Sequence, residues 1–264
     1  VETIAMYPHT QQLFGISDNN QWSAWGPEIG TRSADDVASA PYLMKSARNS
    51  IKDFFNLGVT LNNGITLSGG TENSRTYFSY NNTYQTGLIP NNDFRRNNVM
   101  LKEAFSLFDK RVNISTSLNW IHQKTNNAPV VGKALSTLYP LYRTPADIDM
   151  RYFKHNYKHI GTRADNIVSD PEKGNPKLAG QPVQTWYWYD QYLNNPYWVA
   201  NMYNDVQKRD RIMGNITLDA IIWKNIKYQT RFSVDYVLQN NLNEEYAGMN
   251  RVGFDYVGGK YYSS

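Results

Sequence analysis

The sequence predicts an all-β fold of long antiparallel strands, namely a segment of a transmembrane β-barrel with long extracellular loops. Two observations predict it. Apolar and polar residues alternate over stretches of about ten residues or more, and the connections between these stretches are alternately short and long. A third observation agrees. Aromatic residues make up 14% of the chain, as expected for strands with one face in lipid and one in water.

The clearest alternation predicts three strands, and weaker alternation predicts three more. In the stretch 226–239, for example, apolar residues and Thr230 occupy the even positions, while nearly all odd positions are polar. The predicted strands cover 57–69, 75–86, 97–107, 112–122, 211–222 and 226–239.

The connections divide into a short and a long kind. Three short turns rich in Gly, Asn, Asp and Lys join the strands in pairs. The intervening connections are longer, above all the loop 123–196, and a long stretch also follows residue 239. Short turns at one end and long loops at the other are typical of outer-membrane barrels, whose long loops face the outside.

Matching the apolar faces of the last two strands predicts their register. Residue 222 is expected to pair with 226 and residue 218 with 230. The same register places Asp219 opposite Gln229 and Asp235 opposite Met213, which separates these two carboxylates.

A soluble antiparallel sandwich would alternate in the same way. Sandwich strands usually have about 5–6 residues, and the predicted strands are about twice as long. Glu103 opposes the barrel interpretation, because it falls on the apolar side of 97–107. A bulge, or a place near a turn, would remove that conflict.

Composition excludes several other classes. The chain of 264 residues has no cysteine, which excludes a disulfide scaffold, a thiol nucleophile and a Cys-ligated metal site. Lys and Arg (27) nearly balance Asp and Glu (23) and form no blocks, so no nucleic-acid partner is indicated. The longest apolar runs are far shorter than the roughly 20 residues of a membrane helix.

Linked motifs resemble those of SusC/RagA-type TonB-dependent transporters of Bacteroidetes. The segments that carry the resemblance follow one another in the family's order, over roughly 20–126 and 195–238. They are WGP at 25–27, DFFNLG at 53–58, ITLSGGTE at 65–72, GLIPNNDFRRNN at 87–98, NPYW at 195–198 and RIMGN at 211–215.

The resemblance implies a barrel of about 22 strands in the outer membrane, with a plug domain, a TonB box and a SusD-like surface lipoprotein as lid. Import of oligosaccharides or peptides would depend on the TonB complex. Neither plug nor TonB-box motifs occur between Val1 and Ser264. We therefore expect residues 1–264 to be part of one barrel domain, in contact with outer-membrane lipid.

The loop 181–198 carries the candidate substrate-binding residues. Aromatic rings stack on sugar faces or apolar peptide side chains, and a neighbouring carboxylate can hold hydroxyl or amide groups. Alternatively, these rings pack the loop onto its surroundings. The candidates are Trp186, Tyr187, Trp188, Tyr189 and Asp190.

No residue pattern predicts an enzyme, a cofactor or a metal site. Nucleotide-binding and nucleophile-elbow motifs are absent from the sequence. His155 and His159 are four residues apart but lack an obvious third ligand. The alternative function is a soluble or surface β-sheet module that binds glycans, and a glycoside hydrolase ranks third because no carboxylate pair is evident.

Overall fold

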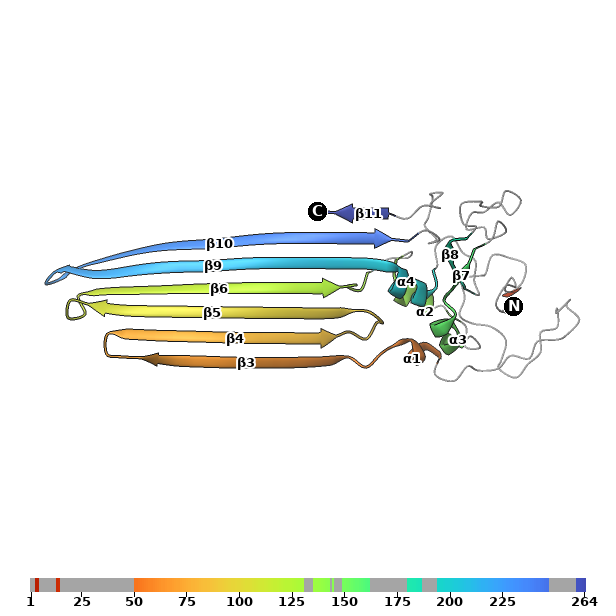
Figure 1. Cartoon of the computed structure of the whole chain (residues 1–264), viewed down its shortest axis with the longest axis horizontal. Coiled ribbons are helices and arrows are strands. Elements are labelled where there is room, and N and C mark those ends of the chain that lie inside the picture. Colours follow the sequence, from red (N-terminus) through yellow and green to blue (C-terminus); the bar gives the residue numbers. More distant parts are fainter. Residues whose placement is uncertain are drawn as a thin grey trace, which may run out of the picture.

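A single antiparallel sheet of seven strands dominates the structure, in the order β11-β10-β9-β6-β5-β4-β3. The computed structural model describes residues 3–4, 13–14, 50–130, 135–142, 144, 149–161, 180–186, 194–246 and 260–264. The long strands lie side by side in one layer, and the helices lie at one end of them (Figure 1). The predicted all-β antiparallel fold is thus confirmed, while the described strands form an open sheet.

Each of the six predicted ranges overlaps one strand of the sheet. Four strands, β5, β6, β9 and β10, extend further toward the helical end than predicted, because their residues there are mostly polar and alternation no longer marks them. The strands of the sheet are β3 (Val59–Gly70), β4 (Ser74–Thr86), β5 (Asp93–Leu107), β6 (Val112–Asn126), β9 (Tyr203–Trp223), β10 (Ile226–Glu245) and β11 (Lys260–Ser263).

The connection between β6 and β9, expected as one long loop over 123–196, contains several short elements instead. It spans 76 residues, from 127 to 202, yet β6 and β9 are neighbours in the sheet. The remaining elements are β1 (Thr3–Ile4), β2 (Leu13–Phe14), β7 (Lys158–Ile160), β8 (Pro182–Gln184), α1 (Ser50–Phe54), α2 (Leu138–Tyr142), α3 (Met150–His155) and α4 (Pro196–Met202).

The register of β9 and β10 agrees with the predicted one over most of its length. Leu218 pairs with Thr230 as predicted. The predicted pair of residues 222 and 226 is wrong: Ile226 pairs with Trp223, and Lys227 pairs with Ile221. A register shift between residues 226 and 227 skips Ile222, because the two-residue turn sets a pairing that is one residue out of step with the rest of the two strands.

Asparagine side chains fasten the connection 87–92 to the rest of the helical end. The Nδ2 atom of Asn92 donates to the carbonyl oxygens of Asn126 and Asn127, both at 3.0 Å. The Nδ2 atom of Asn91 donates to the Ala200 carbonyl oxygen at 3.0 Å. These bonds join the β4–β5 connection to the end of β6 and to α4, although the segments are far apart in the sequence.

The buried apolar residues of the described chain lie mainly at the helical end. α4 begins with Asn195 as N-cap, whose side chain accepts from the backbone NH of Tyr197, and Pro196 follows at the first helical position. Tyr197 packs with Phe54, Leu141, Met150 and Phe153 in one cluster. Within the long strands of the sheet, most apolar side chains remain exposed instead.

The turn between β5 and β6 has an unfavourable backbone. Phe108, Asp109 and Lys110 have φ angles of 53°, 52° and 66°. This left-handed region costs an L-residue roughly 1–2 kcal/mol and costs glycine almost nothing.

We therefore expect Lys110→Gly to raise the free energy of unfolding by about 0.5–1 kcal/mol, measured by urea titration of the refolded protein. Lys224→Gly is the matched control, because it removes the same charge from the β9–β10 turn at a residue without positive φ. A stabilisation of equal size in both variants would contradict the role of backbone strain.

Candidate functional site

One face of the sheet carries a mainly apolar surface, here called the apolar band, which Glu103 and Thr116 interrupt. On β5 it runs from Val99 to Leu107 and on β6 from Val112 to Trp120, nine residues in each strand. Ile212–Ala220 and Tyr228–Leu238 continue it on β9 and β10. Many of its side chains are exposed, including Leu101, Leu118, Ile216, Phe232 and Val234.

The apolar band ends in a row of aromatic side chains toward the helical end. Tyr80, Trp120 and Tyr236 share one row of directly opposed residues, with Val99 and Ile212 between them. The next row on this face is polar: Asn82 donates to Asn97 at 2.8 Å, and the Nδ1 atom of His122 lies 2.8 Å from Asp210. The change from apolar to polar therefore takes place within two residues along β4, β5, β6 and β9, whereas on β10 the apolar side continues to Leu238.

The opposite face of the sheet is polar, as the alternation predicts. Arg211 on β9 donates from Nε to Asp235 on β10 at 2.8 Å. Nearer the short turns, Gln229 donates to Asp219 at 2.7 Å and Arg231 to Thr217 at 3.0 Å. The predicted positions of Asp219 and Asp235, opposite Gln229 and Met213, are confirmed.

A hollow of about 720 Å³ lies on this polar face, near the short turns. Lys102 and Tyr77 line it, with the ammonium 5.6 Å from the ring centroid. Ser117 and Asn215 line its other side and are hydrogen-bonded to each other at 2.6 Å. Its lining of hydroxyl, amide, aromatic and cationic groups suits water or a polar solute.

Glu103 lies on the apolar face, and its carboxylate accepts hydrogen bonds from two hydroxyl groups. Ser74 donates to it at 3.1 Å and Thr76 at 2.6 Å. The register around it is continuous, so no bulge removes the charge from this face. Thr76 is only two residues from the start of β4, which places Glu103 beside the turn that joins β3 and β4.

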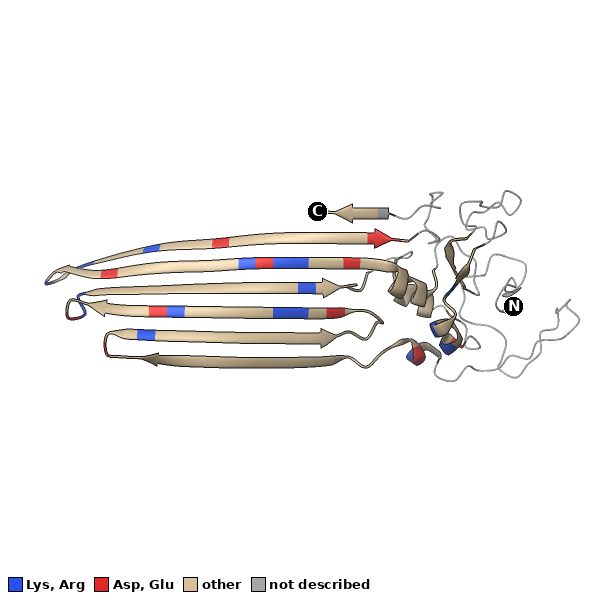
Figure 2. Ribbon diagram, in the orientation of Figure 1, with Lys and Arg blue, Asp and Glu red and all other residues tan. Residues whose placement is uncertain are grey.

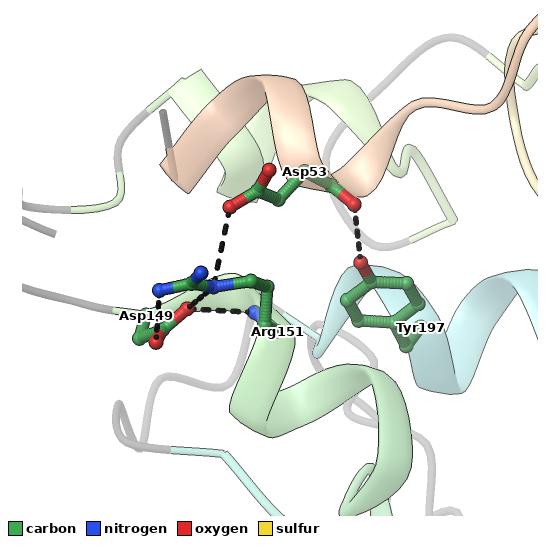
Figure 3. A network of polar contacts seen from close by, with 4 residues as sticks. All are labelled: Asp53, Asp149, Arg151 and Tyr197. Atoms are coloured by element: carbon green, nitrogen blue, oxygen red, sulfur yellow. Dashed lines mark hydrogen bonds and ion pairs between the residues drawn. The ribbon is translucent and has the colours of Figure 1, made fainter. Parts of the chain in front are cut away.

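A polar network joins three helices at the other end of the sheet (Figure 3). Arg151 of α3 forms ion pairs with Asp149 at 3.0 Å and with Asp53 of α1 at 3.5 Å. The hydroxyl of Tyr197, on α4, donates to the Asp53 carbonyl oxygen at 3.0 Å. The hydrogen bond from Arg151 lowers the pKa of Asp149, and the same pair raises the pKa of Arg151.

Of the predicted substrate-binding residues, the structure describes Trp186. Its ring meets Phe153 edge to face, with centroids 4.9 Å apart, and packs against the buried cluster around Tyr197. Tyr187, Trp188, Tyr189 and Asp190 lie outside the described residues. The packing of Trp186 agrees with the alternative interpretation for this residue, and substrate binding by the five residues stays a prediction.

The sequence did not reveal which charged residues meet across β6 and β9. Lys124 lies opposite Lys208, and His122 lies opposite Asp210. Only the register of two strands separated by 76 residues shows these pairs. The lining of the hollow was missed for the same reason, since it combines residues of β3, β4, β5, β6 and β9.

The part of the chain that the structure describes contains no group of three or more His, Asp or Glu residues placed to hold a metal ion. His159 instead lies 2.9 Å from the Thr185 hydroxyl.

None of the described helices is long and apolar enough to cross a membrane. Comparison with protein-family models and with curated proteins finds no match to this chain.

The pH dependence of stability tests the role of Tyr197 at the helical end. Burial, together with the charges of Asp53 and Asp149, raises its pKa to about 12. An ordinary tyrosine ionises near pH 10. Because the folded pKa is raised, the stability linked to this proton is complete below pH ~10 and is lost as the pH rises toward 12.

Tyr197→Phe removes both the ionisation and the hydrogen bond to Asp53. We expect it to lower stability by about 1 kcal/mol at pH 8 and to flatten the decline in stability between pH 10 and 12, measured by thermal unfolding. Tyr142→Phe is the control, because Tyr142 is 64% exposed. An unchanged alkaline decline in Tyr197→Phe would exclude this residue as its cause.

Proposed function

We propose that the chain forms part of the wall of an outer-membrane β-barrel importer, with the apolar band against lipid and the polar face lining the passage. The observation that carries this proposal is the height of the apolar band. It covers nine residues on β5, β6 and β9 and eleven on β10, from Tyr228 to Leu238, which agrees with the ~9–11 residues of a spanning strand.

The exposure of the band supports lipid as its covering. A soluble sheet of this size packs its apolar face against a second layer. Here the described chain supplies no such layer, and the large apolar side chains of the sheet remain about half exposed, as for Leu118 at 50% and Phe232 at 67%. The aromatic row of Tyr80, Trp120 and Tyr236 is typical of a membrane–water interface.

The edges of the sheet support its continuation into a larger barrel. In the described residues, β3 pairs only with β4, and β11 pairs only with β10. Unpaired backbone groups cost several kcal/mol each in hydrocarbon, so a sheet in a bilayer closes on itself. We propose that further strands at both edges complete a barrel of about 22 strands.

The motifs support the proposed class of importer. The segments DFFNLG at 53–58 and GLIPNNDFRRNN at 87–98 resemble SusC-like TonB-dependent transporters, and the structure uses both at the helical end. Leu88 accepts from the Asn56 backbone NH at 2.8 Å, and Asn91 and Asn92 hold neighbouring connections. We propose oligosaccharides or peptides as substrates, a SusD-like lipoprotein at the helical end, and energy supply by the TonB complex.

Two adjacent residues of β5 test the membrane orientation. Leu101 lies within the apolar band, whereas Met100 faces the polar side. We expect Leu101→Arg to destabilise the inserted protein by about 2–4 kcal/mol, measured by urea titration of the full-length protein in lipid vesicles. Met100→Arg is the matched control, with an expected effect below ~1 kcal/mol.

Equal effects of the two arginines would contradict the proposed orientation. Extraction of the full-length protein into the aqueous phase without detergent would contradict membrane insertion altogether. That second result would favour the soluble glycan-binding module instead.

The aromatic loop gives a separate test of substrate contact. We expect Trp188→Ala to weaken binding of the transported oligosaccharide or peptide by about tenfold, measured by calorimetry on the complex with its lipoprotein, without a change in thermal stability. Trp186→Ala serves as the comparison. It should lower stability by about 3 kcal/mol, because its ring packs against Phe153. Unchanged affinity in Trp188→Ala would remove this residue from the binding site.

A further inference from the structure

Three cationic side chains lie directly opposite one another on neighbouring strands, on the apolar face of the sheet. Arg95 of β5 is opposite Lys124 of β6, which is opposite Lys208 of β9. Arg95, Lys124 and Lys208 are here called the cation row. The blue segments of β5, β6 and β9 lie at a similar level toward the helical end (Figure 2).

The cation row lies on the same face as the apolar band and just beyond its end. On β6, Lys124 follows Trp120 by four residues, so both side chains are on one face. Four residues span about 13 Å along a strand, or about 10 Å along the normal of a bilayer for a tilt near 40°. Long basic side chains can bend back over part of this distance, which brings their charges to the headgroup region.

The charges of the cation row are incompletely balanced by the chain. Like charges directly opposite each other on a sheet are unfavourable. Asp93 lies 3.7 Å from Arg95 and also accepts from Asn126 at 2.7 Å. Among the described residues, neither Lys124 nor Lys208 forms an ion pair.

The next carboxylate on this face lies on the side of the cation row toward the apolar band, and it already has a partner. Asp210, the nearest acidic residue toward the apolar band, lies 2.8 Å from the Nδ1 atom of His122. Tyr84 completes the row on β4, with its ring centroid 5.0 Å from the Arg95 guanidinium carbon. The exposed side of the row therefore presents two ammonium groups and a guanidinium beside an aromatic ring.

We propose that the cation row binds the phosphate group of an anionic lipid headgroup in the leaflet at the helical end of the sheet. The guanidinium can donate two parallel hydrogen bonds to phosphate oxygens, and the two ammonium groups add point charges. The acyl chains would lie along the apolar band below. This proposal rests on the proposed membrane function, because only insertion brings a headgroup to this level.

Two neighbouring pairs of residues give a matched experiment. Arg95→Gln with Lys208→Gln removes two charges from the cation row. Arg96→Gln with Arg209→Gln removes two charges at the same level, one residue along each strand and therefore on the polar face. The full-length protein is purified in a non-ionic detergent and incubated with diphosphorylated lipid A, with the dephosphorylated lipid and with inorganic phosphate.

Retained lipid is measured by native mass spectrometry at low ionic strength. We expect the cation-row variant to bind the phosphorylated lipid roughly tenfold more weakly than the unaltered protein, and the polar-face variant to bind it as the unaltered protein does. The dephosphorylated lipid should bind weakly to all three proteins. Competition by millimolar inorganic phosphate alone would indicate a site for free anions and overturn the assignment to a lipid.

Equal loss in the two variants would also overturn the proposal, since it would show a general effect of charge. Failure of the proposed function is distinguishable. In that case the unaltered protein needs no detergent and binds neither lipid. A protein that inserts but binds phosphorylated lipid independently of Arg95 and Lys208 refutes the lipid site and leaves the membrane function intact.

Discussion

The sheet is one layer thick, so each of its two faces needs a suitable medium or layer against it. The rest of this structure depends on that constraint. Alternation sends the apolar side chains of β5, β6, β9 and β10 to one face and polar groups to the other. Apolar area on this scale is unfavourable in water unless another medium or layer covers it. The apolar band, the aromatic row above it and the polar rows beyond it are all consequences of how that face is covered.

The helical end solves a different problem, since it packs in the manner of an ordinary soluble domain. Tyr197 and Trp198 are nearly inaccessible to solvent, and Arg151 joins α3 to α1. Asn91 and Asn92 hold this small unit on the strand ends. A stable unit at one end and an uncovered sheet at the other allow one chain to meet two different surroundings.

Sequence predicts most of the sheet, because alternation reports which side chains share a face. It fails where that contrast weakens: Asp93–Arg96 and residues 203–210 are mostly polar and do not alternate, yet both belong to strands. It also fails at Ile226, where a local register shift overrides the matching of apolar faces. Asn195 and Pro196 form a helix start of a kind that sequence can reveal, because Asn is a preferred N-cap and Pro a preferred first helical residue. The cation row forms because strands that are distant in the sequence pair with each other, and no local sequence pattern reveals that pairing.

Arg95 with Arg96, and Lys208 with Arg209, place positive charge on both faces of the sheet at a single level. In the proposed orientation, the charges on the apolar face cannot move into hydrocarbon without a large cost, whereas those on the polar face stay in the aqueous passage. The opposite end also carries charge, since Lys110, Arg111, Lys224 and Lys227 lie in or beside its short turns. In the proposed membrane orientation, charge at both ends of the sheet would limit how far the strands can shift along the membrane normal when the bilayer thickness changes.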